Sequence, residues 1–591
     1  MFVTMKYRVC MTLESAEAFT VPADQPETTE VVTATGLEWW RTAVIYQIYP
    51  RSFADSTGNG IGDLPGITGR LQSLSELGVD AIWLSPFFTS PQNDAGYDVS
   101  DYCNVDPMFG TLADFDTLVT HAHGLGLKVI VDMVPNHTSD QHAWFQEALA
   151  SPVGSPERDR YMFHDGQGPS GDLAPNNWES VFGGPMWQRT TNPDGTPGQW
   201  YLHIFDVSQP DLNWENPWVH EQFFGILRFW LDRGVDGFRV DVAHGMIKEE
   251  GLPDYAPPAE GASMGGTAAV ASDLDAVIPE VHPDPPYWGH SGVHEIWRGW
   301  NAVLAEYEGD RVMAAEAWVD PLEKMALWVR PDEFSQAFNF GYMFTEWTAP
   351  TMRSIIDESI AAFSGVGAPS TWVLSNHDVV RHATRLALHA DVPQGSGIGP
   401  DTEGKPDTAE GLHRARAATS LMLALPGSAY LYQGEELGLP EDMELPDAAR
   451  QDPTWFRTDH EKYGRDGCRV PIPWEADKPS YGFGPGAKSW LPQPTDWGPY
   501  SRDAQEGVPG STLELYRSAL ALRAEHGLGA GSIEWLDGYG PDVLAMRNGA
   551  VTVIVNFGDV AVELPLDEIL LASEKIVGGA LPADTAVWLR S

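Results

Sequence analysis

The sequence has few cysteines, few basic residues and no long apolar run, and each shortage excludes a class of protein. Only three cysteines, Cys10, Cys103 and Cys468, occur among 591 residues, and none is close to another. A disulfide-rich framework and a cysteine-ligated zinc site are therefore not expected. No stretch approaches the ~18 consecutive apolar residues of a membrane-spanning helix, so no membrane partner is expected.

Basic residues are outnumbered more than two to one by acidic residues. The chain has 36 Lys and Arg against 84 Asp and Glu, which gives a formal net charge of −48. Nucleic acids and anionic membranes bind basic surfaces, so neither is an expected partner. A neutral small-molecule substrate fits this charge balance better. The charge itself is explained by a solvated acidic surface that favours solubility.

The amino-terminal segment MFVTMKYRVCMTLESAEAF lacks the apolar core of a secretory signal. Together with the low cysteine content, this predicts a cytoplasmic location. Residues 1–36 are polar, poor in aromatic residues and predicted to form a mobile leader. Nothing in the sequence fixes the oligomeric state.

From residue 38 onward, short apolar runs rich in β-branched residues alternate with longer amphipathic stretches. Strands of a parallel sheet that is buried on both faces are continuously apolar, as these runs are. Eight strand-then-helix units predict an α/β fold, a (β/α)₈ TIM barrel. The runs are AVIYQIYP (43–50), AIWLSP (81–86), KVIVDMVP (128–135), GFRVDVA (237–243), VMAAEAW (312–318), QAFNF (336–340), TWVLSNHD (371–378) and AYLYQGEE (429–436).

Long inserts and a change of pattern predict the domain organisation. A stretch rich in Gly, Pro, Asn and Trp follows the third run and is expected to overhang the barrel mouth. Shorter inserts, at about 251–290 and 382–412, also follow strand ends. After about Gly510 the alternating runs predict an antiparallel β-sandwich. The predicted parts are the leader (1–36), the first part of the barrel (37–137), an inserted domain after strand three (138–206), the second part of the barrel (207–509) and the C-terminal β-sandwich (510–591).

Polar residues gather at the carboxyl ends of the predicted strands, where barrels of this kind carry their catalytic groups. Three acids, Asp241, Glu316 and Asp378, lie in runs that are otherwise apolar enough for a core. A buried carboxylate without a partner is costly, so each needs an ion pair or a function. A single such acid is as well explained by a structural ion pair. Three acids directed to one mouth indicate a catalytic site.

Two carboxyl groups that face one site suit glycoside cleavage, in which one attacks the anomeric carbon and the other protonates the leaving oxygen. Arg239 precedes Asp241 by two residues and so shares its strand face. Its charge is expected to lower the pKa of Asp241 and keep this nucleophile ionised. Glu316 lies in the apolar run AAEAW, where desolvation is expected to raise its pKa for acid work.

Four motifs, in order along the predicted strands, resemble the signature regions of the α-amylase family of glycoside hydrolases. They are DMVPNH (132–137), GFRVDVAH (237–244), EAWV (316–319) and LSNHDVVR (374–381). QPDLN (209–213) resembles the additional motif of the oligo-1,6-glucosidase/α-glucosidase branch. The resemblance implies a retaining mechanism with Asp241 as nucleophile, Glu316 as general acid/base and Asp378 as the acid that distorts the sugar. It also implies that the long insert is the B domain of the family.

The same resemblance implies a set of residues that hold the sugar. Tyr97 and Asp98, in GYDVSDY, match an aromatic platform and the acid that binds hydroxyls of the non-reducing end. Arg469, in RDGCRVPIPW, is the candidate partner of Asp98. A closed site of this type favours exo-cleavage of one glucose unit. The complete set of implied sugar-binding residues is Tyr97, Asp98, His137, Arg239, His377 and Arg469.

Val242 directly follows the implied nucleophile. In the α-glucosidase branch, Val at this position tends to accompany activity on α-1,6 bonds, and Thr accompanies α-1,4 preference. The resemblance therefore favours α-1,6 activity, although Val242 is equally well explained as an ordinary β-branched strand residue.

The segment DSTGNGIGD (55–63), after the first predicted strand, places side-chain oxygens at alternate positions between glycines. Such a loop can wrap a hard cation, and family relatives often carry Ca²⁺ or Mg²⁺ there. Thr57 and Asn59 stand where carboxylates would bind more tightly, and a metal-free turn is the alternative. No cofactor is expected for catalysis. The implied ligands of a structural ion are Asp55, Thr57, Asn59, the carbonyl of Ile61, and Asp63.

These observations predict an exo-acting α-glucosidase that acts on short neutral oligosaccharides of the maltose or isomaltose type. Transglucosylases, sucrose isomerases and trehalose-active enzymes share the same motifs and remain alternatives, because the glucosyl-enzyme can pass to water or to a sugar. A non-enzymatic binding protein on this fold is disfavoured, since all three acids are present.

Overall fold

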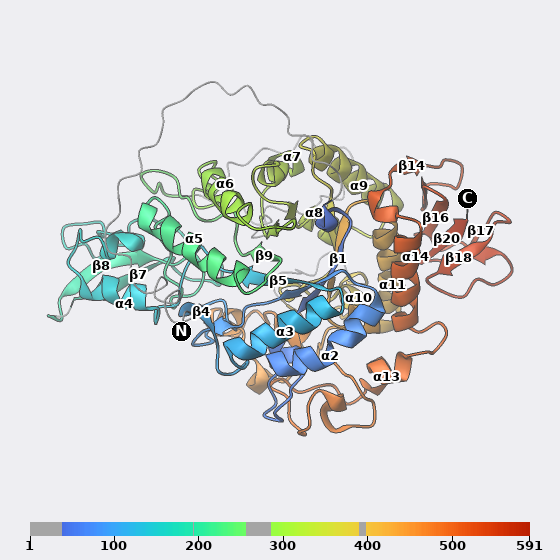
Figure 1. Ribbon diagram of the computed structural model, residues 1–591, viewed down its shortest axis with the longest axis horizontal. Helices are drawn as coiled ribbons and strands as arrows, with labels where there is room; N and C mark the ends of the chain where they lie inside the picture. The colour runs from blue at the N-terminus through green and yellow to red at the C-terminus, as the bar shows by residue number, and fades with distance from the viewer. Residues whose placement is uncertain (1–37, 193, 256–284, 389–396, 591) are drawn as a thin grey trace.

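The computed structural model describes residues 38–192, 194–255, 285–388 and 397–590 (Figure 1). The predicted leader (1–36) and most of the predicted insert at 251–290 lie outside the described residues. The remainder forms a central barrel with a small sheet at one end and a C-terminal sheet at the other (Figure 1).

Eight parallel strands form the barrel sheet, and each coincides with one of the predicted apolar runs, except that the last strand begins one residue earlier, at Ser428; this confirms the predicted TIM barrel. Their order in the sheet is β11-β10-β9-β5-β2-β1-β13-β12. The two end strands approach each other, because the N–H of Asn339 donates to the carbonyl of Thr371 at 3.3 Å. The strands are β1 (Val44–Ile48), β2 (Ala81–Leu84), β5 (Lys128–Met133), β9 (Gly237–Val240), β10 (Val312–Ala315), β11 (Gln336–Ala337), β12 (Thr371–Val373) and β13 (Ser428–Tyr432).

Helices that alternate with the strands cover the outside of the barrel, and most begin at a side chain that caps them. Asp63 accepts from the N–H of Gly66 at the start of α2, and Thr111 and Asp114 form a capping box on α3. The long helices are α2 (Leu64–Leu77), α3 (Leu112–Gly124), α5 (Pro217–Leu231), α6 (Val293–Leu304), α9 (Ala349–Ser364), α11 (Thr408–Ala424) and α14 (Thr512–Glu525). Short helices are α1 (Pro50–Phe53), α7 (Leu322–Met325), α8 (Phe340–Phe344), α10 (His382–Arg385), α12 (Pro453–Arg457) and α13 (Arg502–Gln505).

Alternate residues of each strand face the barrel interior, and the interior changes from apolar to polar toward the carboxyl ends. Ile130 belongs to the apolar interior cluster, and Asp132, two residues later, hydrogen-bonds to Trp83 of the same cluster. The period of two in strands places such residues on one face. Apolar packing therefore closes the bottom of the barrel, and charged side chains are presented at the mouth.

The insert after β5 forms a separate small layer, which lies at the left of Figure 1. It has one helix, α4 (Ala143–Ala150), and a three-stranded antiparallel sheet of β6 (Phe163–His164), β8 (Pro197–Leu202) and β7 (Trp187–Thr191). Trp178, Met186, Trp187, Leu202 and Ile204 form its own core. A two-stranded sheet of β3 (Phe88–Thr89) and β4 (Asp101–Val105) follows β2.

The C-terminal part contains two antiparallel sheets, as the alternating runs predict. The larger has the order β14-β15-β16-β20-β18, and β17 pairs with β19. Trp588 in β20 donates its indole N–H to the carbonyl of Ser420 in α11, so this sheet packs on the barrel. The strands are β14 (Ile533–Trp535), β15 (Val543–Asn548), β16 (Val551–Asn556), β17 (Val562–Glu563), β18 (Ile569–Ala572), β19 (Ala580–Leu581) and β20 (Thr585–Arg590).

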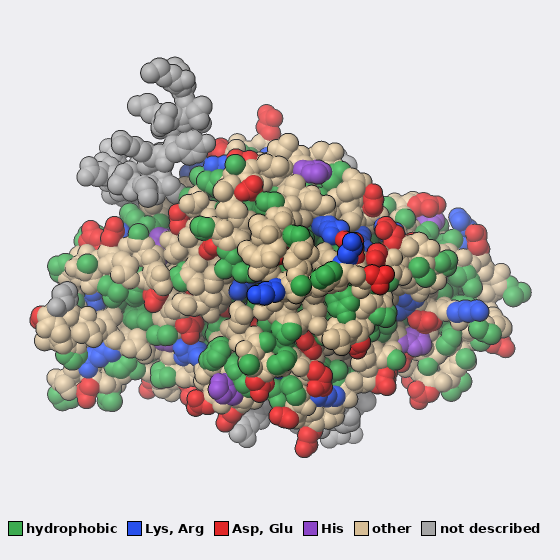
Figure 2. Space-filling view, turned by 90° about the horizontal axis from the view of Figure 1, so that it is seen from below, with side chains coloured by type: hydrophobic (Ala, Val, Ile, Leu, Met, Phe, Trp, Pro, Cys, Tyr) green, Lys and Arg blue, Asp and Glu red, His purple; other side chains and the backbone are tan. Residues whose placement is uncertain are grey.

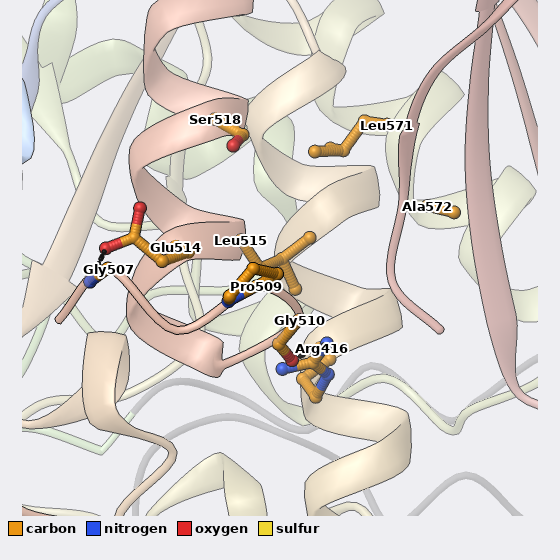
Figure 3. A pocket seen from close by; sticks show the side chains of 9 residues that line it. All are labelled: Arg416, Gly507, Pro509, Gly510, Glu514, Leu515, Ser518, Leu571 and Ala572. Carbon is orange, nitrogen blue, oxygen red and sulfur yellow. Dashed lines mark hydrogen bonds between the residues drawn. The ribbon is translucent and has the colours of Figure 1, made fainter. Parts of the chain in front are cut away.

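A cavity of about 340 Å³ lies at this junction, between α11, α14 and β18 (Figure 3). Arg416 lines it, but its guanidinium donates to the carbonyls of Ser573 and Gly510 and to the hydroxyl of Thr512. Arg416 therefore fixes the C-terminal sheet to the barrel and is not available to a ligand.

The acidic excess lies largely on the surface. Carboxylates are scattered over the face shown in Figure 2, with fewer basic side chains between them. Among the described residues, no helix is both long and apolar enough to cross a membrane.

Glu435, which follows β13, is buried against α14. It accepts from the backbone N–H of Tyr432 at 3.0 Å and from the hydroxyl of Tyr516 at 3.4 Å. Burial raises the pKa of Glu435 from its ordinary 4.5 to about 8. Between these two values the folded state binds a proton that the unfolded state has released. The contribution of this proton on Glu435 to the free energy of unfolding is therefore complete below pH 4.5 and is lost as the pH rises through 8.

We predict that the thermal midpoint falls between pH 6 and pH 9, and that Glu435→Gln reduces this fall, because glutamine keeps the hydrogen bonds without a titratable proton. Thermal unfolding of both proteins at the two pH values measures it. Glu525→Gln, at an exposed position on α14, is the control and should unfold with the wild-type pH dependence. Equal slopes for wild type and Glu435→Gln would refute the prediction.

Candidate active site

Strand register brings the catalytic candidates together at the barrel mouth. Asp132 in β5 and Arg239 in β9 are direct cross-strand partners. Asp241 and Glu316 follow the ends of β9 and β10, two residues beyond the interior positions Arg239 and Ala314, which are themselves register partners. Neighbouring parallel strands therefore place these side chains in adjacent layers on the interior face.

One guanidinium holds three carboxylates. Arg239, whose side chain is 2% exposed, donates through Nη1 to Asp132 Oδ1 at 2.9 Å and to Asp241 Oδ1 at 2.7 Å. Its Nη2 donates to Glu316 Oε2 at 2.6 Å. Asp241 and Glu316, the implied nucleophile and acid/base, are therefore in contact with one cation. The structure thus brings together the two carboxyl groups that were predicted from the sequence.

The expected lowering of the pKa of Asp241 was wrong, because Asp241 shares the Arg239 guanidinium with two other carboxyls. Arg239 was expected to lower the pKa of Asp241, but burial and the nearby carboxyls of Glu316 and Asp132 outweigh it and raise the pKa well above its ordinary value. Burial likewise raises the pKa of Asp132 to about 7. A single cation cannot keep three buried carboxylates ionised, so the cluster retains a proton near neutral pH.

Glu316 receives more hydrogen bonds than Asp241. Besides Arg239, the backbone N–H of Val242 donates to its Oε2 at 3.2 Å, and the indole of Trp318 donates to its Oε1 at 3.0 Å. Val242 has a φ of 48°, a left-handed conformation that is strained for a β-branched residue. This kink directs the Val242 amide toward the Glu316 carboxyl, so local strain is used to hold the acid/base candidate.

Asp378 lies in a different electrostatic environment. Arg465 Nη1 and Arg469 Nη2 each donate to its Oδ1 at 3.0 Å, and His377 Nε2 lies 3.1 Å from its Oδ2. Although burial opposes it, His377, Arg465 and Arg469 hold the pKa of Asp378 below its ordinary range. Asp378 is therefore ionised at neutral pH, and its side chain is 23% exposed.

Tyr97 and the two predicted histidines line the same site. The Tyr97 hydroxyl lies 2.6 Å from His377 Nε2, and the two rings stack with centroids 5.3 Å apart. His137 Nε2 lies 3.1 Å from the carbonyl of Tyr97. Burial lowers the pKa of His137 to about 4, so this ring is neutral and can donate one hydrogen bond.

The expected pairing of Asp98 with Arg469 was wrong. Asp98 is fully buried and accepts from the hydroxyl of Ser90 and the backbone N–H groups of Asn93 and Asp94. These three local donors satisfy both oxygens, so Asp98 holds its own loop in shape. Burial raises its pKa to about 6. Among the described residues, no hydrogen bond or ion pair joins it to Arg469, which binds Asp378 instead.

Asp94 and Arg465 form the acid–arginine pair that was expected of Asp98 and Arg469, and neither residue was predicted from the sequence. Arg465 Nη2 donates to Asp94 Oδ1 at 2.9 Å, while its Nε donates to Asp452 Oδ2 at 2.6 Å. Gln209, the first residue of QPDLN, donates to Asp94 Oδ2 at 3.1 Å. The available signal was proximity: Asp94 precedes Tyr97 by three residues, and Arg465 precedes Arg469 by four.

Three aromatic side chains stand beside these charged groups, and the motifs did not reveal them. Phe182 lies under Arg465, whose Cζ is 5.1 Å from the ring centroid. Phe205 lies 5.7 Å from Phe182 and 6.2 Å from Trp288, centroid to centroid. Trp288 stacks on His244, the last residue of GFRVDVAH, at 4.4 Å. We call Phe182, Phe205 and Trp288 the aromatic wall.

The predicted metal loop closes through its own hydrogen bonds. Asp55 accepts from the N–H groups of Thr57, Gly58 and Gly60, and Asn59 accepts from that of Ile61. Asp63 accepts from Ser56 and also caps α2. Among the described residues, no group of three or more His, Cys, Asp or Glu side chains is arranged to hold a metal ion. With two carboxylates, the hard oxygen donors of this loop fit a weakly held cation.

We therefore propose weak Ca²⁺ or Mg²⁺ binding in this loop. The thermal midpoint of the wild type should rise only at millimolar Ca²⁺, and Asn59→Asp, which adds a third carboxylate, should respond at lower concentrations. Thermal unfolding across a Ca²⁺ titration, with Asn192→Asp as the matched control in the B domain, measures both. An Asn59→Asp variant no more responsive than the wild type would count against a cation in this loop.

Comparison with known proteins agrees with this geometry. The family model described as "Alpha amylase, catalytic domain" matches residues 47–530. The chain is 40% identical over 551 residues to a probable alpha-glucosidase of Rhizobium meliloti (strain 1021), covering 91% of this chain and 93% of that protein. It is 35% identical over 518 residues to an oligo-1,6-glucosidase of Heyndrickxia coagulans, covering 82% and 85%.

Among solved structures, the alpha-glucosyl transfer enzyme XgtA superposes with a TM-score of 0.77 at 37% identity, covering 94% of this chain and 100% of that chain. The matched family region contains every candidate catalytic residue described above. The chain therefore belongs to the alpha-amylase family and is a glycoside hydrolase.

Proposed function

We propose that this protein is a retaining, exo-acting α-glucosidase that hydrolyses terminal α-glucosidic bonds of short oligosaccharides of the maltose or isomaltose type. The observation that carries the proposal is the contact of both Asp241 and Glu316 with the Arg239 guanidinium. The proposal places the enzyme in the cytoplasm, in line with its sparse cysteines. The relatives named alpha-glucosidase and oligo-1,6-glucosidase support the substrate class.

In the proposed mechanism, Asp241 attacks the anomeric carbon while Glu316 protonates the leaving oxygen. Both carboxyls contact Arg239, and the raised pKa of Asp241 keeps a proton on it in the free site. Bond cleavage requires that proton on Glu316, which leaves Asp241 ionised against Arg239 Nη1. Water activated by the Glu316 carboxylate then attacks the glucosyl-enzyme and restores the α-configuration.

Asp378 and its neighbours are proposed to bind the glucose ring itself. Asp378 is ionised and partly exposed, so it can accept hydrogen bonds from two ring hydroxyls. Neutral His137 and the Tyr97–His377 stack complete this side of the ring. Asp94, held between Arg465 and Gln209, takes the part first assigned to Asp98, the recognition of the non-reducing end.

A second candidate function, transglucosylation, has support of its own. The aromatic wall extends from Arg465, which pairs with Asp378, to His244 at the end of the motif that carries Asp241. Aromatic rings of this kind can stack on a sugar or another acceptor. One of the similar solved structures is named an alpha-glucosyl transfer enzyme. Product profiling on maltose, isomaltose, sucrose and trehalose separates the two, since predominant synthesis of new glucosides at modest substrate concentration would replace hydrolase by transferase.

Asp241→Ala should abolish hydrolysis of p-nitrophenyl α-glucoside, because no other carboxylate can form the glucosyl-enzyme. Added azide should restore cleavage in this variant and yield β-glucosyl azide, since azide takes the vacated face. Glu316→Ala with azide should yield α-glucosyl azide instead. NMR identifies the products.

Asp116→Ala, which removes an exposed carboxylate paired with Arg233, is the control and should keep wild-type rates. Wild-type turnover in Asp241→Ala, or the opposite anomers of glucosyl azide, would overturn the assignment of the two roles.

Val242→Thr should shift the linkage preference toward α-1,4 bonds. The substitution keeps the β-branched shape at φ 48° and replaces one methyl by a hydroxyl beside the nucleophile. We expect the ratio of kcat/KM for isomaltose to that for maltose to fall by about tenfold. Val242→Ile keeps an apolar branch and is the matched control. A ratio that does not fall in Val242→Thr would show that this position does not select the linkage.

A further inference from the structure

The B-domain segment 180–184 forms a tight turn that carries Phe182 at its tip. The N–H of Gly183 donates to the carbonyl of Ser180 at 2.8 Å, and the N–H of Ser180 donates to that of Gly184 at 2.7 Å. Gly183 and Gly184 have φ values of 101° and 76°, a region that glycine enters readily. Inside the B domain the turn is held by the hydroxyl of Ser180, which donates to the carbonyl of Phe205, and an outside contact that adds to this restricts Phe182 further.

Arg457, the last residue of α12, supplies that contact from the barrel side. Its Nε and Nη2 both donate to the carbonyl of Gly183, at 3.0 and 2.6 Å. Its Nη1 donates to Asp206 Oδ1 at 3.1 Å. The planar guanidinium therefore joins two separate B-domain segments to the barrel, which a single ammonium group cannot do in the same geometry.

Asp206 extends this contact to the sugar site. Its backbone N–H donates to Gln209 Oε1 at 2.9 Å. The amide nitrogen of Gln209 lies 3.1 Å from Asp94 Oδ2 and 3.1 Å from His137 Nε2. A chain of contacts therefore leads from Arg457 through Asp206 and Gln209 to Asp94 and His137.

A second chain of contacts from Arg457 also leads to Asp94. It passes through Gly183 to Phe182, whose ring lies under the Arg465 guanidinium. Arg465 is the ion-pair partner of Asp94 and of Asp378. The first residue before α12, Asp452, also binds Arg465, so this short segment holds Arg465 at one end and the B domain at the other.

We propose that Arg457 is a positioning residue that clamps the B domain onto the barrel and so fixes the glucose-binding wall formed by Phe182, Asp94 and Arg465. This inference rests on the proposed glucosidase function. Arg457 touches none of the reacting carboxyls in the described contacts; its effect passes through Gly183 and Asp206. Loss of the clamp weakens binding of the glucose ring equally in the ground and transition states, which raises KM and leaves kcat nearly unchanged.

Arg457→Ala should therefore raise KM for p-nitrophenyl α-glucoside about tenfold and change kcat by less than about threefold. The dissociation constant of 1-deoxynojirimycin, an iminosugar mimic of the glucose ring, should rise by the same factor when measured by calorimetry. Arg457→Lys keeps a cation for Asp206 but loses the paired bonds to Gly183, so its KM should lie between those of wild type and Arg457→Ala. Asp206→Asn weakens only the contact of Arg457 with Asp206, so its KM should also be intermediate.

Arg228→Ala is the control, because it loses a two-bond ion pair with Glu306 that is remote from the site and should keep wild-type KM. A folded Arg457→Ala protein with wild-type KM and inhibitor affinity would overturn the inference, as would a fall in kcat at unchanged KM. If Arg457→Ala does not fold, wild-type KM values in both Arg457→Lys and Asp206→Asn would overturn it. Absence of turnover and inhibitor binding in the wild type would instead refute the proposed function.

Discussion

The contact of the Arg239 guanidinium with three buried carboxylates is the interaction on which the site depends. Without it, Asp132, Asp241 and Glu316 would each be buried at the barrel mouth either with an uncompensated charge or with a proton of its own. The register of β5 and β9 sets Asp132 directly beside Arg239. One cation among three acids leaves an excess of negative charge, which the cluster reduces by retaining a proton. That proton is what a general acid must supply.

Two electrostatic environments, each built on arginine, explain why neighbouring acids titrate in opposite directions. Around Arg239 the acids outnumber the cation, and the pKa of Asp241 is raised. Around Asp378 two guanidinium groups face one partly exposed carboxylate, and its pKa is lowered. Burial by itself would raise the pKa of both Asp241 and Asp378. The opposite net shifts therefore come from the local ratio of cations to acids. Neighbouring carboxyls of one site are held in different protonation states in this way.

The barrel was predictable because its strands are set by short-range chemistry: continuous apolar runs, β-branched residues and polar residues at each end. The same logic found Asp241 and Glu316, which directly follow strands, and Asp378, which lies in the loop after β12. It did not find Asp94, because a loop side chain is directed by local hydrogen bonds. Asp98 is turned inward by Ser90 and two backbone amides, which sequence spacing does not reveal. The sharing of Arg239 also escaped prediction, since Asp132 belongs to a different strand.

Strands and inserts hold different groups of the site. The carboxyls that are proposed to react directly follow β9 and β10, whose positions the barrel fixes through hydrogen bonds on both sides. The aromatic wall comes from the B domain and from the segment after β9, with Phe182 on a two-glycine turn. Changes in the inserts, or at single positions beside the strand ends such as Val242, can therefore alter the site and leave the charge balance at Arg239 intact. In agreement, the similar proteins include both a probable alpha-glucosidase and an alpha-glucosyl transfer enzyme, so a shared fold accompanies different activities.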